Sequence, residues 1–136
     1  MGMLKAFIVA ASVALAWPAA AQDIVCHDPL KPMLRAELFF GRNIGGQPDI
    51  TERQWLEFVT RELTARFPDG LTMIDGLGQW RDSGGAIVRE PAKIVIIVTA
   101  NDASVGERVA AATAAYKLRF QQTSVGVVMQ PVCAAF

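Results

Sequence analysis

The polar side chains that could carry chemistry gather in one stretch of the chain, residues 66–93. The set comprises Arg66, Asp75, Gln79, Trp80, Arg81, Arg89, Glu90 and Lys93. Carboxylates at strand positions are disfavoured unless they are paired. One interpretation is therefore a polar pocket in which Asp75 or Glu90 acts as a base and a nearby Arg66, Arg89 or Lys93 binds an anion. The other is a salt-bridge network that holds this stretch against the first helix and the first strand.

Two strands must position these residues. The turn cluster Asp82-Ser83-Gly84-Gly85 separates residues 71–81 from residues 86–99, and its glycines can adopt positive φ. We predict a β-hairpin with a four-residue loop. That register places Trp80 opposite Ile87, Asp75 opposite Ala92, and Glu90 opposite Leu77.

The far end of this hairpin is predicted to overhang the sheet as an arm. Pro91 cannot donate to a strand ladder, so pairing on one side of the second strand is interrupted there. Gly76 and Gly78 in the first strand suggest a bulge or a close backbone approach. Trp80 near the tip has little local core to enter, so we expect it to pack onto the first helix or onto a second subunit.

The flanking segments supply two helices and two further strands. Residues 34–40 and 124–132 alternate as strands, and residues 105–120 carry apolar side chains at helical spacing. Thr51 and Gln54 form a capping box, and Leu56, Val59, Leu63 and Phe67 follow as an apolar stripe. The order strand, helix, strand, strand, helix, strand predicts an α+β, ferredoxin-like βαββαβ fold: a four-stranded antiparallel sheet with two helices on one face.

The N-terminal segment is typical of a signal peptide. Lys5 precedes an apolar run over residues 6–17, and Ala19-Ala20-Ala21 fits a cleavage site. We predict a signal peptide at residues 1–21, a single α+β domain at residues 22–136, and a periplasmic or secreted location; an uncleaved membrane anchor is the alternative. The balance of 13 basic and 13 acidic residues argues against nucleic acid, or a membrane after cleavage, as partner.

The two cysteines predict one disulfide. Cys26 precedes the first strand and Cys133 follows the last, and an even count in an exported domain is typical of a bridge. In the ferredoxin-like topology the first and last strands are antiparallel neighbours, which brings these two positions together. The disulfide and the topology are inferred separately and agree.

Four segments carry a family resemblance: residues 35–41, 64–72, 78–81 and 89–93. They resemble a family of exported bacterial proteins known only as a domain of unknown function, whose signature resembles Thr-Pro-Arg-Phe-Pro followed by Asp-Gly-Leu-Thr. This chain has Thr64-Ala65-Arg66-Phe67-Pro68 and then Asp69-Gly70-Leu71-Thr72. It departs at Ala65, where the family usually has proline, and at Phe39, where relatives are expected to have tyrosine, so a catalytic phenol is not expected there. The resemblance implies export and a single domain, and no activity.

No metal site and no cofactor are predicted. His27 is the sole histidine, and one His-Asp pair falls far short of a metal signature. Gly76-Leu77-Gly78 lies within a strand rather than before a helix, so it is no phosphate loop. We expect a binding or assembly module rather than a catalyst. The alternative is a small enzyme of the dimeric α/β-barrel kind that acts on a small anionic metabolite.

The sheet face away from the helices is the expected interaction surface. We expect it to carry Arg35, Glu37, Phe39, Val95 and Ile97, with Lys93 and Val128 as further candidates. That mixture is too apolar for a solvated face. A homodimer would bury it face to face, or would form through the Trp80 arm.

Overall fold

A computed structural model describes residues 24–44, 47–48 and 50–136; the predicted signal peptide lies outside these residues. The elements in chain order are β1 (Lys31–Gly41), β2 (Asn43–Ile44), β3 (Gln47–Pro48), α1 (Glu52–Phe58), a π-helical continuation of α1 (Val59–Thr64), β4 (Thr72–Arg81), β5 (Ile87–Ala100), α2 (Val105–Phe120) and β6 (Gly126–Ala134). Within the described part of the chain, no helix has both the length and the apolar character needed to cross a membrane.

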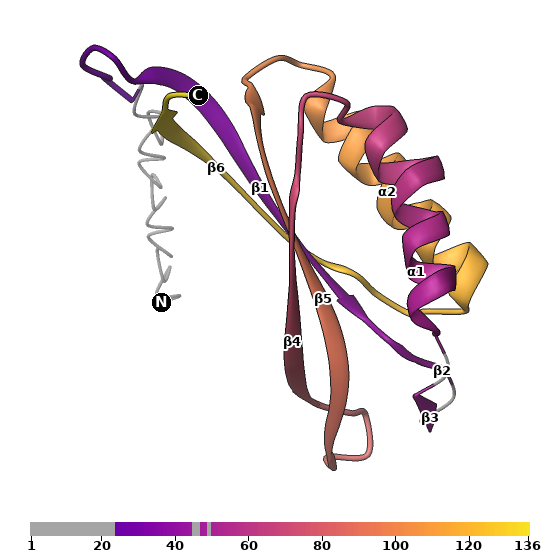
Figure 1. The fold of residues 1–136 in the computed structure, drawn as a ribbon. Helices are drawn as coiled ribbons and strands as arrows, with labels where there is room; N and C mark the ends of the chain where they lie inside the picture. Colours follow the sequence, from indigo (N-terminus) through magenta and orange to yellow (C-terminus); the bar gives the residue numbers. More distant parts are fainter. Residues whose placement is uncertain (1–23, 45–46, 49) are drawn as a thin grey trace, which may run out of the picture.

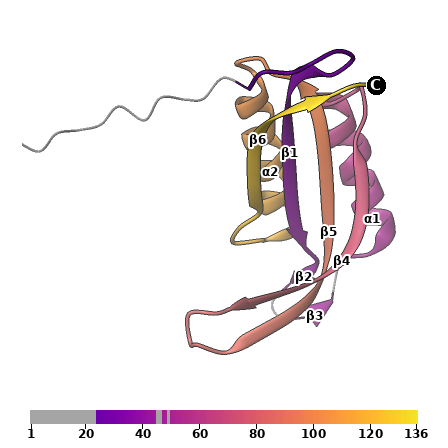
Figure 2. The same ribbon diagram turned by 90° about the vertical axis from the view of Figure 1, so that its left-hand side faces the viewer.

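The predicted ferredoxin-like fold is confirmed. The four long strands form one antiparallel sheet in the order β4-β5-β1-β6, and α1 and α2 lie together on one of its faces (Figures 1 and 2). Residues 43–44 and 47–48 form the short β2–β3 pair. None of the described helices lies on the opposite face of the sheet, which we call the open face.

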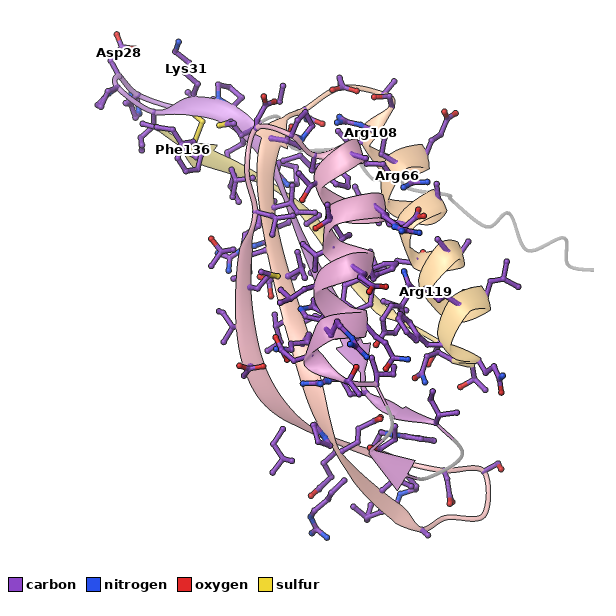
Figure 3. The ribbon with its side chains drawn as sticks, turned by 45° about the vertical axis from the view of Figure 1, so that its right-hand side comes forward. Asp28, Lys31, Arg66, Arg108, Arg119 and Phe136 are labelled. Atoms are coloured by element: carbon purple, nitrogen blue, oxygen red, sulfur yellow. A yellow bond between two sulfur atoms is a disulfide. The ribbon has the colours of Figure 1, made fainter. Side chains whose placement is uncertain are left out.

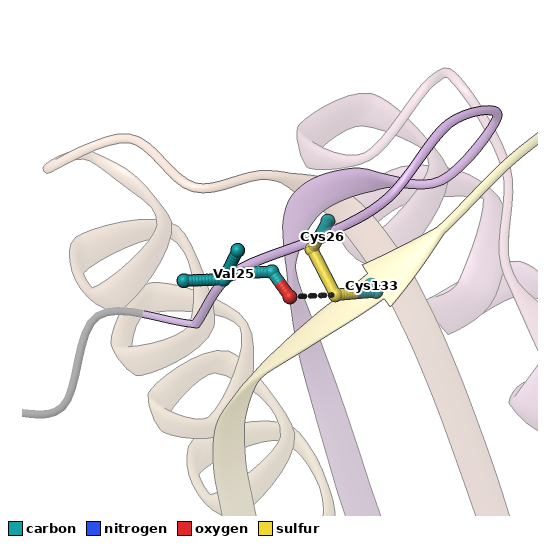
Figure 4. Close-up of a disulfide and its surroundings, with 3 residues drawn as sticks. All are labelled: Val25, Cys26 and Cys133. Carbon is teal, nitrogen blue, oxygen red and sulfur yellow. Dashed lines mark hydrogen bonds between the residues drawn. A yellow bond between two sulfur atoms is a disulfide. The ribbon is translucent and has the colours of Figure 1, made fainter.

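The predicted disulfide is present and joins the edge strand to its neighbour. Cys26 and Cys133 are bonded with their Cα atoms 5.6 Å apart, and the carbonyl of Val25 lies beside the Cys133 sulfur (Figure 4). Pro32 of β1 pairs with Cys133 of β6. The bridge therefore links the segment that precedes β1 to the end of β6, as the topology requires.

The core is an aromatic cluster between the sheet and the helices. Phe40 of β1 packs against the rings of Trp55, Phe58 and Tyr116, with centroids 4.6–5.7 Å apart. All four side chains are fully buried. Edge-to-face contacts of this kind add to the stabilisation from apolar burial.

The first helix is capped as predicted but faces the core differently. Gln54 donates its backbone N–H to Thr51 Oγ1, and the Gln54 side chain accepts the Thr51 N–H in return. Trp55 and Phe58 are buried instead of Leu56, which is 46% exposed, so the predicted stripe was wrong at that residue. A regular α period assigned Leu56 to the core. The π-helical turns widen the period, so that Trp55, Val59 and Leu63, spaced four apart, stay on one face.

The predicted hairpin register was wrong by one residue. The loop spans residues 82–86, because Asp82 N–H donates to the Ala86 carbonyl and Ala86 N–H donates to Asp82 Oδ1, each at 2.9 Å. The observed pairs are Trp80 with Val88, Asp75 with Lys93, and Glu90 with Gly78. The ladder runs one to one through the two strand glycines, so there is no bulge. In a sheet, such a shift moves side chains between faces.

The open face was only half predicted. Arg35, Glu37, Phe39 and Val128 lie on it, but Lys93, Val95 and Ile97 face the helices opposite the buried Phe40, Leu38 and Ala36. Ile94, Ile96 and Val98 take their places. An all-apolar strand gives no alternation from which to choose its faces.

The overhanging arm is present. β1 pairs with β5 as far as Gly41 and Ala92, and beyond that point β4 and β5 pair only with each other. Figure 2 shows this two-stranded ribbon coiling across the lower end of the sheet, toward the side on which α2 and β6 lie. Two-stranded ribbons twist more strongly than wider sheets. The bend lies at Gly76, Gly78 and Ala92, whose small size leaves room for this twist.

Candidate functional site

The coiled arm encloses a cleft of about 560 Å³ on the open face. Its walls come from the arm, from the end of β1, and from the segment between α2 and β6. The lining residues are Phe39, Gly41, Asn43, Gly78, Gln79, Trp80, Asp82, Val88, Glu90, Ala92, Gln121, Gln122, Thr123, Ser124 and Gly126. A volume of this size is typical of sites for small molecules.

The floor of the cleft consists of residues with little or no side chain. Gly41 lies beside Ala92 in the sheet, and Gly126 lies beside Phe39. Gly78 of β4 lies on the same face, opposite Glu90. A Cβ atom on Gly126 would lie 3.2 Å from the Phe39 side chain. The hollow therefore exists because these strand positions lack bulk, between the larger side chains of Phe39 and Trp80.

Glu90 provides the fixed polar group of the cleft. Its carboxylate accepts a hydrogen bond from Trp80 Nε1 at 2.9 Å and another from the Asn43 backbone N–H at 3.2 Å. It also lies directly over Gly41, where an added Cβ would be 2.7 Å from the carboxylate oxygen. Only glycine permits this approach, and the two donors hold the carboxylate there.

Hydrogen bonds from the second helix and from the segment that follows it fix the backbone under this carboxylate. The Tyr116 hydroxyl donates to the Gly41 carbonyl at 2.7 Å, and Gln122 Nε2 donates to the Asn43 carbonyl at 2.6 Å. Burial raises the pKa of Tyr116, so its phenol keeps the proton that it donates. The cleft is thus anchored to the aromatic core.

The charge of the cleft is negative. Asp82 and Glu90 are its only charged lining residues among those described, and no lysine or arginine lines it. None of the ion pairs formed by the described residues involves Glu90, whose partners are neutral N–H groups. A ligand that brings N–H donors or a positive charge is favoured here over an anion.

A separate charge cluster lies on the helix side of the same hairpin. Lys93 is 5% exposed, and its Nζ lies 2.6 Å from the Asp75 carboxylate and 2.9 Å from that of Glu52. Burial by itself would lower the pKa of Lys93, but the hydrogen bonds to Asp75 and Glu52 outweigh it and raise that pKa. The hydrogen bond from Lys93 holds the pKa of Asp75 below its ordinary value. This cluster fastens the start of α1 to the hairpin.

The remaining predicted residues lie apart from both clusters. Arg66 pairs with Glu62 at 2.6 Å, and its carbonyl accepts a hydrogen bond from Arg108, at the end of the helices away from the arm (Figure 3). Arg89 is exposed opposite Gln79. Arg66 therefore holds the end of the first helix. This structural role accounts for the arginine in the segment 64–68, which carries the family resemblance.

The eight candidates thus fall into three groups. Gln79, Trp80 and Glu90 line the cleft, and Asp75 and Lys93 pair on the helix side. The three arginines join neither cluster: Arg66, Arg89, and Arg81, which donates to the Gly85 carbonyl in the hairpin loop. Sequence reasoning missed the lining residues with small or neutral side chains, namely Gly41, Asn43, Ala92, Gln121, Gln122, Thr123, Ser124 and Gly126. The sequence signal for the floor was the presence of glycine and alanine at several strand positions. Only the correct strand register shows that these positions lie together on one face.

Comparisons with known proteins give a family and a fold. Residues 35–136 match the family described as "Protein of unknown function (DUF3574)", and no curated protein matches the chain. A phage SAM lyase in complex with S-methyl-5'-thioadenosine has a similar structure, with a TM-score of 0.60 and 20% identity over 75% of this chain and 90% of that one. CutA from Synechococcus elongatus PCC7942 is similar with a TM-score of 0.51 and 16% identity over 76% and 80% of the two chains. At these identities the likeness concerns the fold alone.

Proposed function

This chain belongs to the DUF3574 family, which has no described function, and we propose that it is an exported, non-catalytic binding protein. Its ligand is a small organic molecule with a flat apolar part and an amine or ammonium group. The observation that carries this proposal is Glu90, a carboxylate held inside an aromatic-walled cleft by neutral donors only.

The ligand class follows from the walls and floor. Trp80 and Phe39 offer aromatic faces, which attract flat rings and cations. The floor of Gly41, Gly78 and Ala92 lets a flat group approach the backbone closely. Glu90 then accepts an N–H of the ligand or neutralises its charge.

Catalysis in the same cleft is the second candidate. One observation favours it: a protein of similar fold is a SAM lyase that was solved with S-methyl-5'-thioadenosine, a neutral molecule with a flat amine-bearing ring. The anionic substrate that the sequence suggested is less suitable, because no cation lines the described cleft.

Export is part of the proposal. The predicted signal peptide supports it, and so does the Cys26–Cys133 bond, because disulfides persist in oxidising compartments. We place the mature protein in the periplasm or outside the cell.

Calorimetric titration of the mature protein tests the ligand class. The probes are S-methyl-5'-thioadenosine as the neutral ring, tryptamine as the cation and indole-3-acetate as the anion. We expect the first two to bind at least about tenfold more tightly than the anion, a difference typical of one charge-assisted hydrogen bond. Tighter binding of the anion would overturn the proposal, and chemical conversion of a bound probe, seen by chromatography, would favour the enzyme.

A variant that fills the floor locates the binding. Ala92→Leu extends a side chain into the cleft and should abolish probe binding while the protein stays folded. Ala111→Leu makes the same change on the exposed side of α2 and should leave binding unchanged. Equal affinities in both variants would show that the probes bind elsewhere.

A further inference from the structure

The open face is organised in rows that cross the sheet. Ile74, Ile94 and Phe39 lie side by side on β4, β5 and β1, and the next row contains Ile96, Glu37 and Val128. Phe39, Ile74 and Val128 are each between 38% and 47% exposed. No described element covers these rows (Figure 2). This is a contiguous apolar surface of the kind that marks an interaction site.

The charges on these rows are self-complementary. Arg35 and Glu37 occupy successive open-face positions of β1, with the Arg35 Nε atom 2.9 Å from the Glu37 carboxylate. The rows of Phe39, Glu37 and Arg35 carry no other charged residue. A two-fold axis through the centre of this face sets Arg35 of one copy against Glu37 of the other, so the same surface serves both partners.

The face also offers much of the area that a stable contact needs. β1 has 11 residues, β5 and β6 each pair with nine of them, and β4 lies beside only the five from Glu37 to Gly41, so this face covers roughly 550 Å² before side-chain relief is counted, given the usual strand rise and spacing. Stable interfaces bury about 800 Å² on each partner. The flat area of the sheet face alone supplies about two thirds of that value.

We infer that two copies of this chain pack open face to open face, with the two-fold axis between the rows of Arg35 and Glu37 and the apolar row of Phe39 beside them. A second copy fits better than an unrelated partner, because the face offers one cation and one anion at adjacent positions among apolar side chains. The inference rests on side chains other than those of the ligand cleft, except for Phe39, through which the interface adjoins the cleft.

Sedimentation equilibrium of the mature protein tests the interface with a matched pair of variants. Val127 and Val128 are neighbours on β6 with exposures of 44% and 47%. Val128 lies on the open face, whereas Val127 lies on the helix side beside the buried Leu38. Val128→Asp should raise the dimer dissociation constant by about tenfold or more, because it buries an unpaired charge, and Val127→Asp should leave it near the wild-type value.

Exchanging the two charges distinguishes a variant that loses the interface contact from one that fails to fold. Glu37→Arg alone sets like charges against each other and should dissociate the dimer, whereas the double variant Arg35→Glu with Glu37→Arg restores opposite charges and should recover it. Thermal unfolding of each variant checks that the monomer is intact. A wild-type monomer at high concentration, or a dimer weakened by Val127→Asp and not by Val128→Asp, would overturn the inference.

Discussion

Asp75 and Glu90 are carboxylates on the two strands of one hairpin, and they serve different purposes because they lie on opposite faces of it. Asp75 lies opposite Lys93 on the helix side and forms an ion pair with it at 2.6 Å. Glu90 lies opposite Gly78 on the open face and accepts only neutral N–H donors. The charge of Asp75 is balanced within the fold, while that of Glu90 remains available to a ligand.

The comparison shows that the position of a residue along a strand decides which face of the sheet its side chain occupies, and therefore what it contacts. Side chains alternate between faces, so moving either residue by one position would exchange its surroundings. Lys93 reaches Glu52 at the start of α1 because it points toward the helices. Glu90 reaches Asn43 and Gly41 because it points the other way, over the end of β1. Variants of the two clusters should therefore have separable effects on stability and on binding.

The largest expected effect is on stability, from Lys93→Ala. The substitution removes a buried side chain whose Nζ atom lies 6.0 Å from the centroid of the Trp55 ring, and it leaves Asp75 without its ion-pair partner and Glu52 with Arg42 alone. We expect the free energy of unfolding to fall by about 2 kcal/mol, measured by urea denaturation. Arg89→Ala removes an exposed cation from the same strand and should change stability by less than about 0.5 kcal/mol. Similar losses in both variants would mean that Lys93 is not a structural anchor.

The next effect is on binding, from Glu90→Gln. The variant keeps the shape of the side chain and removes its charge, so tryptamine affinity should fall about tenfold, with little loss of stability. Asp75→Asn makes the equivalent change on the other face and should leave tryptamine affinity unchanged, as measured by calorimetry. If Asp75→Asn weakens tryptamine binding as much as Glu90→Gln does, the two clusters are not functionally separate.

The sequence predicted the fold well because each signal for it was local. The capping box at Thr51, the turn glycines and the alternating strands agree with one another, and the Cys26–Cys133 pair agrees with the topology that they imply. Consistency between such levels is what makes a sequence specify one structure. The arm was predictable for the same reason, because Pro91 marks the point at which pairing with β1 stops.

The site was less predictable because it depends on register. A four-residue loop and a five-residue loop are both compatible with Asp82-Ser83-Gly84-Gly85-Ala86, and the two hydrogen bonds between Asp82 and Ala86 close the five-residue form. The anionic side chains were visible in the sequence, but the floor of Gly41 and Gly126 comes from segments 85 residues apart. Only the β1–β5 and β1–β6 pairings bring these positions to the hairpin.

The smallest expected effect is a pH dependence that belongs to Asp75 and not to the cleft. The hydrogen bond and charge of Lys93 lower the pKa of Asp75 below its ordinary value of 3.8. A carboxyl group whose pKa is lowered by folding stabilises the native state above its ordinary pKa, and this stabilisation is lost as the pH falls through the folded-state pKa. Wild-type protein should therefore be more stable than Asp75→Asn at about pH 7, and the difference should shrink at about pH 3.

Urea denaturation at both pH values measures this difference, and the Lys93→Met background supplies the control. Without the ammonium group, Asp75→Asn should have the same effect at both pH values, because the main cause of the lowered pKa is gone. A difference between wild type and Asp75→Asn that stays constant from neutral to acid pH would show that the pair does not stabilise the fold. The hairpin would then be held to α1 by apolar packing around Trp55 alone.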